Sequence, residues 1–151
     1  MLRNSRLALA LVLAASCITC SDSTLPRFDM LEARNRWRER GPASYQMTLQ
    51  RSCECLPGEA GPFVVTVRNG VVESRTYPQS NTSIPEHLAD VFPSVEGLFV
   101  MIEHAINERW PVVTVTYDRA LGYPTRVYLD QAPSMPDGAV DTRVQSFQAI
   151  P

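Results

Sequence analysis

Hydrophobic positions along the chain recur with two different periods, and these periods predict its secondary structure. Apolar residues at helical spacing, with charges between them, predict helices over residues 28–40 and 94–109 and a short helical turn over 83–91. Alternating and β-branched apolar residues predict strands. The segments with this character are residues 45–52, 63–68, 71–77, 112–117, 125–130 and 142–150.

Residues at the element boundaries support this assignment. Asn69-Gly70 between two strands is a strong hairpin signal, because both central positions of such a turn need positive φ. Ser83 with Glu86 has the form of a capping box for the short helical turn, and Ser94 is placed to cap the longer helix. The order αβββ-αβββ predicts an α+β fold, in which an antiparallel sheet of about six strands carries two main helices on one face.

The first residues have the features of an export signal. Arg3 and Arg6 precede an apolar run over residues 7–16 that is too short to cross a membrane, and Cys17 follows at once. We therefore expect residues 1–16 to be removed as a signal peptide and Cys17 to be lipidated. The alternative is an ordinary secreted protein with a free thiol at Cys17.

The expected lipid anchor also defines the domain organisation and the location. Residues 17–27 would be the lipidated cysteine and a tether, and residues 28–151 a single domain large enough for one hydrophobic core. The anchor places this domain on the extracytoplasmic side of a bacterial membrane. Ile18 is not the aspartate associated with inner-membrane retention, so we expect the outer membrane where the cell has two membranes.

The charge balance excludes one class of partner. Removal of residues 1–16 takes Arg3 and Arg6 from the 14 basic residues and none of the 16 acidic residues, which leaves a net charge of −4. Nucleic-acid-binding proteins are typically strongly basic on one face, so we expect no nucleic-acid partner. The sequence also lacks a polybasic patch, so the lipid anchor alone is expected to hold the protein on a membrane.

Cys53 and Cys55 are the most chemically distinctive pair in the chain. In a straight strand they lie too far apart for a disulfide, so a bridge requires the chain to bend at Glu54. An oxidising compartment favours the bridge, and we expect a structural staple because redox motifs usually place two residues between the cysteines. A site built from both thiolates with His87 and His104 has the wrong spacing, so we expect no metal and no cofactor.

A candidate binding loop contains Asp118, Gly122 and Tyr123. Asp118 and Asp130 could act as paired carboxylates for acid–base chemistry or cation binding, but they fall at opposite ends of one predicted hairpin. A tight turn explains the loop better, because an aspartate at its start accepts backbone N–H groups and the glycine supplies a left-handed residue.

From Tyr45 onward the chain resembles a family of bacterial secreted and lipoprotein domains, the domain of unknown function 6174. The residues that carry the resemblance are Tyr45, 51–55, 65–72, 92–95, Leu98, Phe99, 115–118, 121–124 and Asp130. The resemblance supports the predicted fold and export and implies a family-wide need for the turn, but it implies no chemistry. One departure lies near Asp137, where Gly138 and Ala139 interrupt a small acidic cluster that the family tends to show.

No Ser/His/Asp arrangement, phosphate-binding loop or HExxH motif is present in the sequence. We therefore predict a membrane-anchored cell-envelope lipoprotein that is not an enzyme but a binding or accessory module. One sheet face or the hairpin loops would contact a protein or another envelope component. The alternative is an envelope thiol-disulfide protein that uses Cys53 and Cys55.

Overall fold

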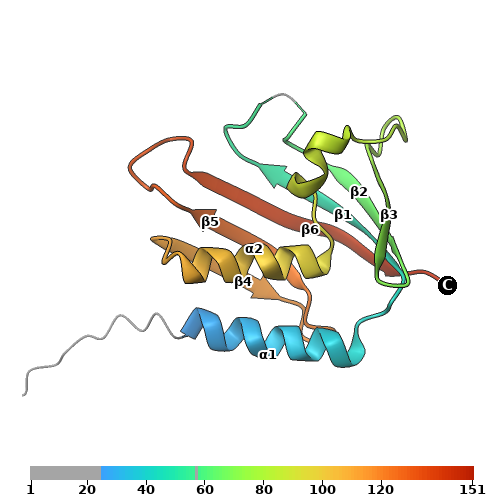
Figure 1. Cartoon of the computed structure of the whole chain (residues 1–151), viewed down its shortest axis with the longest axis horizontal. Helices are drawn as coiled ribbons and strands as arrows, with labels where there is room; N and C mark the ends of the chain where they lie inside the picture. The colour runs from blue at the N-terminus through green and yellow to red at the C-terminus, as the bar shows by residue number, and fades with distance from the viewer. Residues whose placement is uncertain (1–24, 57) are drawn as a thin grey trace, which may run out of the picture.

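The computed structural model describes residues 25–56 and 58–151 (Figure 1). The predicted signal peptide 1–16 and the lipidation site Cys17 lie outside the described residues. The elements follow the predicted order αβββ-αβββ, with a short 3-10 helix before the second long helix. The helices are α1 (Leu25–Arg40), η1 (Glu86–Val91) and α2 (Val95–Asn107).

Six strands form one antiparallel sheet in the order β3-β2-β1-β6-β5-β4, which confirms the predicted fold class. Strands β1 and β6 lie at the centre of the sheet. The pairing of β6 with β1 therefore joins the group β3-β2-β1 to the group β6-β5-β4. The strands are β1 (Tyr45–Ser52), β2 (Phe63–Arg68), β3 (Val71–Thr76), β4 (Val112–Tyr117), β5 (Pro124–Asp130) and β6 (Ala139–Ala149).

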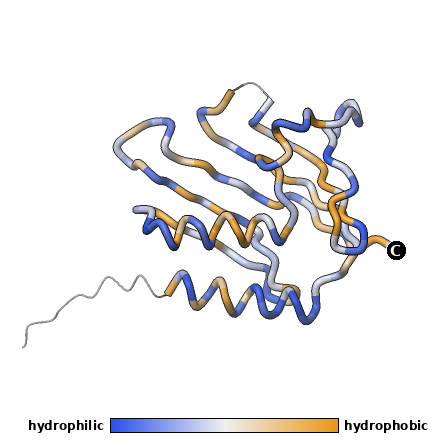
Figure 2. The backbone as a smooth tube through the Cα atoms, in the orientation of Figure 1, coloured by the Kyte–Doolittle hydropathy of each residue, from blue (hydrophilic) through white to orange (hydrophobic). Residues whose placement is uncertain are grey.

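Both long helices and η1 pack on one face of the sheet. Alternate side chains of the strands are buried against one side of each helix, as the period of two in a strand and 3.6 in a helix requires. Hydrophobic positions therefore recur along the strands and along α2 (Figure 2). In β1 the buried residues are Tyr45, Met47 and Leu49. The opposite face of the sheet carries the other half of the strand residues, and we call it the open sheet face.

Helix α1 and strand β6 begin earlier than the sequence predicts, and β5 begins one residue earlier, at Pro124. Helix α1 begins at Leu25 rather than at residue 28, because Pro26 suits the first turn of a helix, where its missing N–H is not needed. Arg27 then joins this turn to the end of α2 by a 2.7 Å hydrogen bond to the Asn107 side chain. Strand β6 begins at Ala139 rather than at residue 142, because its first residues pair with β5.

The predicted capping box at Ser83 is wrong. Ser83 forms a β-bridge with Thr76, and Ile84 N donates to Arg75 O at 2.9 Å, so this segment extends along the end of β3. Helix η1 begins only at Glu86 and has no side-chain cap. Pairing with a strand therefore overrides the local capping signal.

Helix α2 begins as predicted and ends earlier. The Ser94 hydroxyl accepts a 3.2 Å hydrogen bond from Gly97 N, which confirms its role as the cap. The helix ends at Asn107 rather than at residue 109, because Arg109 adopts a left-handed conformation with φ of 54°. Trp110 N donates to Ala105 O at 3.0 Å, which closes the C-terminus in a Schellman motif.

Candidate functional site

The open sheet face carries a charged cluster at the junction of β5 and β6. Asp141 accepts hydrogen bonds from Arg126 Nε at 2.9 Å and Arg126 Nη2 at 3.0 Å. Arg143 adds bonds from Nε at 3.1 Å and Nη2 at 2.7 Å to Asp141 Oδ2. The sheet register brings these residues together, because Arg126 lies opposite Arg143 and Tyr128 lies opposite Asp141. We call Arg126, Asp141 and Arg143 the Arg–Asp–Arg cluster.

This cluster is a local positive site on an acidic chain. One carboxylate is shared by two guanidinium groups, which leaves one positive charge unbalanced within the cluster. The hydrogen bond from Arg126 is the main reason that the pKa of Asp141 lies below its ordinary value. The Arg126 guanidinium also lies 5.9 Å from the centre of the Tyr128 ring. Both arginines remain exposed, so they are accessible to an anionic partner group.

Neutral polar side chains lie beside the cluster on the open sheet face. Gln46 Nε2 donates to Thr66 Oγ1 at 3.1 Å on neighbouring strands, and the hydroxyls of Thr48 and Ser146 are 2.9 Å apart. These pairs lie across β2, β1 and β6. The face therefore offers hydrogen-bonding side chains next to the cationic cluster, and no nucleophile paired with a base is visible among these described side chains.

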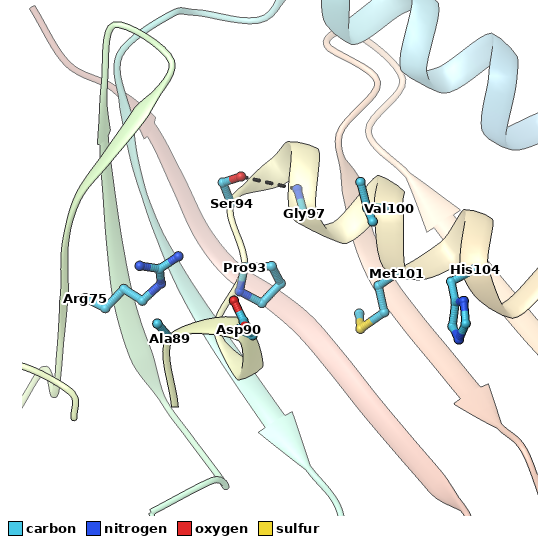
Figure 3. Close-up of a pocket in the computed structure, with 9 residues that line it drawn as sticks. All are labelled: Arg75, Ala89, Asp90, Pro93, Ser94, Gly97, Val100, Met101 and His104. Carbon is cyan, nitrogen blue, oxygen red and sulfur yellow. Dashed lines mark hydrogen bonds between the residues drawn. The ribbon is translucent and has the colours of Figure 1, made fainter. Parts of the chain in front are cut away.

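A pocket of about 460 Å³ lies on the helical side, between η1, β3 and α2 (Figure 3). Arg75 and Asp90 contribute charge at one end, and His104 lies at the other end. The wall between them is mainly apolar and includes Pro93 and Met101. Arg75 Nε donates to Phe92 O at 2.6 Å, so this arginine also holds the chain between η1 and α2. A pocket of this size and composition could accommodate a small amphipathic molecule.

Cys53 and Cys55 are joined by a disulfide just beyond the end of β1. Their Cα atoms are 5.2 Å apart, and the chain bends at Cys53 and Glu54, as the sequence argument required. The following loop returns to the strand, since Gly61 N donates to Arg51 O at 3.2 Å. The bridge therefore shapes the exit from β1.

The candidate binding loop is a turn that packs on α1. Asp118 Oδ1 accepts hydrogen bonds from Ala120 N at 2.9 Å and Leu121 N at 2.7 Å, as the turn interpretation predicted. Gly122 has φ of 89°, and a Cβ there would overlap with the backbone of α1. Tyr123 stacks on Phe147 with ring centres 4.4 Å apart. These contacts give the loop residues a structural role.

The structure does not bring the other sequence candidates together. Asp130 pairs with Val112 at the start of β4, whereas Asp118 follows the end of β4. The Asp130 carboxylate accepts from Ala132 N at 3.0 Å and so fixes the next turn. His87 lies on η1 and His104 on α2, whereas the disulfide follows β1. Within the described part of the chain, no three His, Cys, Asp or Glu side chains are arranged to hold a metal ion.

The Arg–Asp–Arg cluster was missed by the sequence analysis. The signal was the alternation within β5 and β6, which places Arg126 with Tyr128, and Asp141 with Arg143, on one face of each strand. The register between the two strands was needed to see that the four residues meet.

Comparison with known proteins adds a family but no activity. The model of a family of unknown function, DUF6174, matches residues 29–149. No curated protein and no solved structure matches the chain. The match extends over α1 as well as the strands, so it covers more of the chain than the resemblance that begins at Tyr45.

Proposed function

The chain belongs to the family of unknown function DUF6174, and we propose that it is a membrane-anchored binding module of the bacterial cell envelope. Lipid on Cys17 holds the domain at the extracytoplasmic side of a membrane, the outer one where there are two. The domain binds a protein or another envelope component without catalysing a reaction.

The proposed membrane anchor rests on the N-terminal sequence. Arg3 and Arg6, the short apolar run 7–16 and the cysteine directly after it match the features of a lipoprotein signal. Across residues 25–56 and 58–151, none of the helices is long and apolar enough to cross a bilayer. The test is the mass of the membrane-extracted protein, which should correspond to a chain that begins at an acylated Cys17. Replacement by Cys17→Ala should release the protein from the membrane.

The open sheet face is the main observation that supports a binding function. Helices cover one face of the sheet, whereas the other face exposes Gln46, Thr114 and Ser146 together with the Arg–Asp–Arg cluster. Exposed guanidinium groups that share one carboxylate favour a partner with carboxylate or phosphate groups. The surrounding hydroxyl and amide groups add hydrogen bonds that fix its orientation.

Site-specific photocrosslinking in the living cell tests this face. A crosslinking amino acid at Thr114 on the open face should give a defined adduct, whereas one at Glu108, an exposed position at the end of α2, should not. The Thr114 adduct should fall several-fold when Arg126→Gln and Arg143→Gln are combined. Equal adducts from Thr114 and Glu108 would contradict the assignment of the open face as the binding surface.

A matched control separates local charge from total charge. The pair Arg109→Gln and Arg119→Gln removes the same two positive charges from exposed positions outside the open face. This pair should leave the Thr114 adduct unchanged. A loss of equal size in both double variants would show a general charge effect.

The alternative is an envelope thiol-disulfide protein, and the observation that favours it is the bridge between two partly exposed cysteines. Replacement of Cys53 and Cys55 by serine distinguishes the two functions. A fold that stays intact, with a defect in envelope disulfide chemistry, would favour the redox function. Loss of thermal stability alone would favour the binding module.

A further inference from the structure

The outer side of α1 carries an exposed apolar stripe. Leu25, Phe28 and Leu31 are 59%, 65% and 42% exposed. Residues three apart lie on the same side of a helix, so the three side chains form one strip over the first two turns. The opposite side of α1 is buried in the core at Met30 and Trp37. The helix therefore has apolar residues on two sides, whereas a surface helix normally has them on one.

The sides of α1 between these two are already used within the domain. Toward α2, Arg34 forms a 3.1 Å ion pair with Glu103. Toward β4, Ala33 and Arg36 line the groove beside Tyr117. The apolar stripe is the side of α1 that these contacts leave exposed. Figure 2 shows only that hydrophobic and hydrophilic residues alternate along α1.

The charge of α1 is opposite to that of the rest of the domain. The helix contains five arginines and three acidic residues, a net charge of +2. Residues 41–151 contain seven arginines and twelve acidic residues, a net charge of −5. Residues 25–31, which carry the stripe, contain one arginine and one acidic residue, and the surplus of positive charge lies in residues 32–40, with four arginines and two acidic residues. A helix in which exposed apolar side chains adjoin positive charge is attracted to the interface of an anionic bilayer.

The position of the stripe in the chain brings it near the proposed anchor. Cys17 precedes Leu25 by eight residues, and eight residues span at most about 28 Å when fully extended. We propose that the first two turns of α1 lie on the surface of an anionic bilayer, with Leu25, Phe28 and Leu31 inserted at the boundary between headgroups and acyl chains. This inference rests on the proposed anchoring. It departs from the expectation that the lipid alone holds the protein on a membrane, because it adds a second membrane contact that fixes the orientation of the domain.

Quenching by brominated lipids tests the contact directly. The full chain is produced with its own leader, extracted from membranes and reconstituted in vesicles of phosphatidylethanolamine and phosphatidylglycerol that contain dibrominated lipid. The variant Phe28→Trp should lose about half of its added fluorescence, because side chains of an interfacial helix reach the acyl boundary. The parent protein, with Trp37 and Trp110, supplies the background.

Met135→Trp is the matched control. Met135 is an apolar residue with 60% exposure, in the loop between β5 and β6 and away from α1 (Figure 1). Its fluorescence should be insensitive to the brominated lipid. Equal quenching of the two variants would overturn the proposal. Lack of quenching at Phe28, with shielding of that position only when envelope proteins are added, would also overturn it in favour of a protein partner.

Failure of the anchor is distinguishable from failure of the stripe. A mass spectrum without acyl chains on Cys17, with protein that does not stay with the vesicles after washing, contradicts the proposed anchoring. The unacylated protein can still be added to preformed vesicles, and quenching then tests whether the stripe contacts the bilayer. Quenching of Phe28→Trp in that sample supports the stripe, and lack of quenching overturns it.

Discussion

The indole Nε1 of Trp37 donates a 2.8 Å hydrogen bond to the Glu96 carboxylate, which joins α1 to the first turn of α2. Tyr45 OH donates to the second carboxylate oxygen at 3.3 Å and accepts from Val95 N at 2.9 Å. Burial is the main reason that the pKa of Tyr45 lies well above its ordinary value. One carboxylate therefore links two helices and the central strand β1.

Glu96→Ala should lower the free energy of unfolding by about 2 kcal/mol, because it leaves the buried Trp37 N–H without its acceptor and removes a negative charge from a helix N-terminus. Denaturant unfolding measures the change. Glu54→Ala, at an exposed position beyond β1, is the control and should shift the free energy by less than about 0.5 kcal/mol. Similar losses in both variants would contradict the role of Glu96.

The sequence predicted those parts of the fold that depend on local periodicity. The alternation over Tyr45–Ser52 gives both bounds of β1, and Asn69-Gly70 forms the expected turn with φ of 51° and 78°. The order of elements limits the sheet to a few topologies, so it was sufficient to predict the fold class. The capping box predicted at Ser83 does not form, because the backbone of Ser83 pairs with Thr76 instead. No local sequence pattern marks that pairing.

The candidate sites depended on contacts that the sequence does not specify. The turn at Asp118 could be predicted, since its hydrogen bonds run within a few residues. The packing of Gly122 on α1 and the meeting of Arg126 with Asp141 depend on tertiary register. No local sequence pattern predicts the hydrogen bond between Trp37 and Glu96.

Gly122→Ala should destabilise the fold far more than Gly70→Ala. Both glycines have left-handed φ, of 89° and 78°, which costs a β-carbon about 1 kcal/mol. A Cβ at Gly70 meets nothing within 4 Å, whereas one at Gly122 collides with the backbone of α1 and lies 3.0 Å from Trp37 N. We expect a loss above about 3 kcal/mol for Gly122→Ala. Equal losses in thermal unfolding would contradict the close packing on α1.

The Arg–Asp–Arg cluster should make stability depend on pH in the acid range. Pairing lowers the pKa of Asp141 in the folded protein, so its contribution is present above the unfolded value of about 3.9 and is lost as the pH falls through the lower folded value. At pH 7 the variant Asp141→Asn should be less stable by about 1 kcal/mol, as for a solvent-accessible pair. The difference from the parent should shrink toward pH 2. A difference that is constant with pH would contradict the ion pairing.

The disulfide should contribute little to stability. The bridge closes a loop with a sequence separation of 2, and chain-entropy arguments give about 1.5 kcal/mol for so small a loop. The double variant Cys53→Ser and Cys55→Ser should therefore still fold, and its melting temperature should be only slightly lower than that of the parent protein. Mass spectrometry of the non-reduced parent should show a peptide two hydrogens lighter than the reduced one. Free thiols at both positions in an oxidised sample would contradict the bridge.

Arg109→Gly should stabilise the protein. Arg109 occupies the left-handed position that ends α2, with φ of 54°, where glycine avoids the steric cost of a β-carbon. Because the Schellman hydrogen bond from Trp110 N to Ala105 O does not involve the side chain, it should persist in the variant.

We expect the free energy of unfolding of Arg109→Gly to rise by about 0.5–1 kcal/mol, net of the greater freedom of glycine in the unfolded chain. Arg119→Gly is the control, since Arg119 is exposed and its φ is not left-handed. That variant should be destabilised or unchanged, because glycine there only adds freedom to the unfolded chain. Stabilisation of both variants would point to the lost charge rather than the backbone conformation at the end of α2.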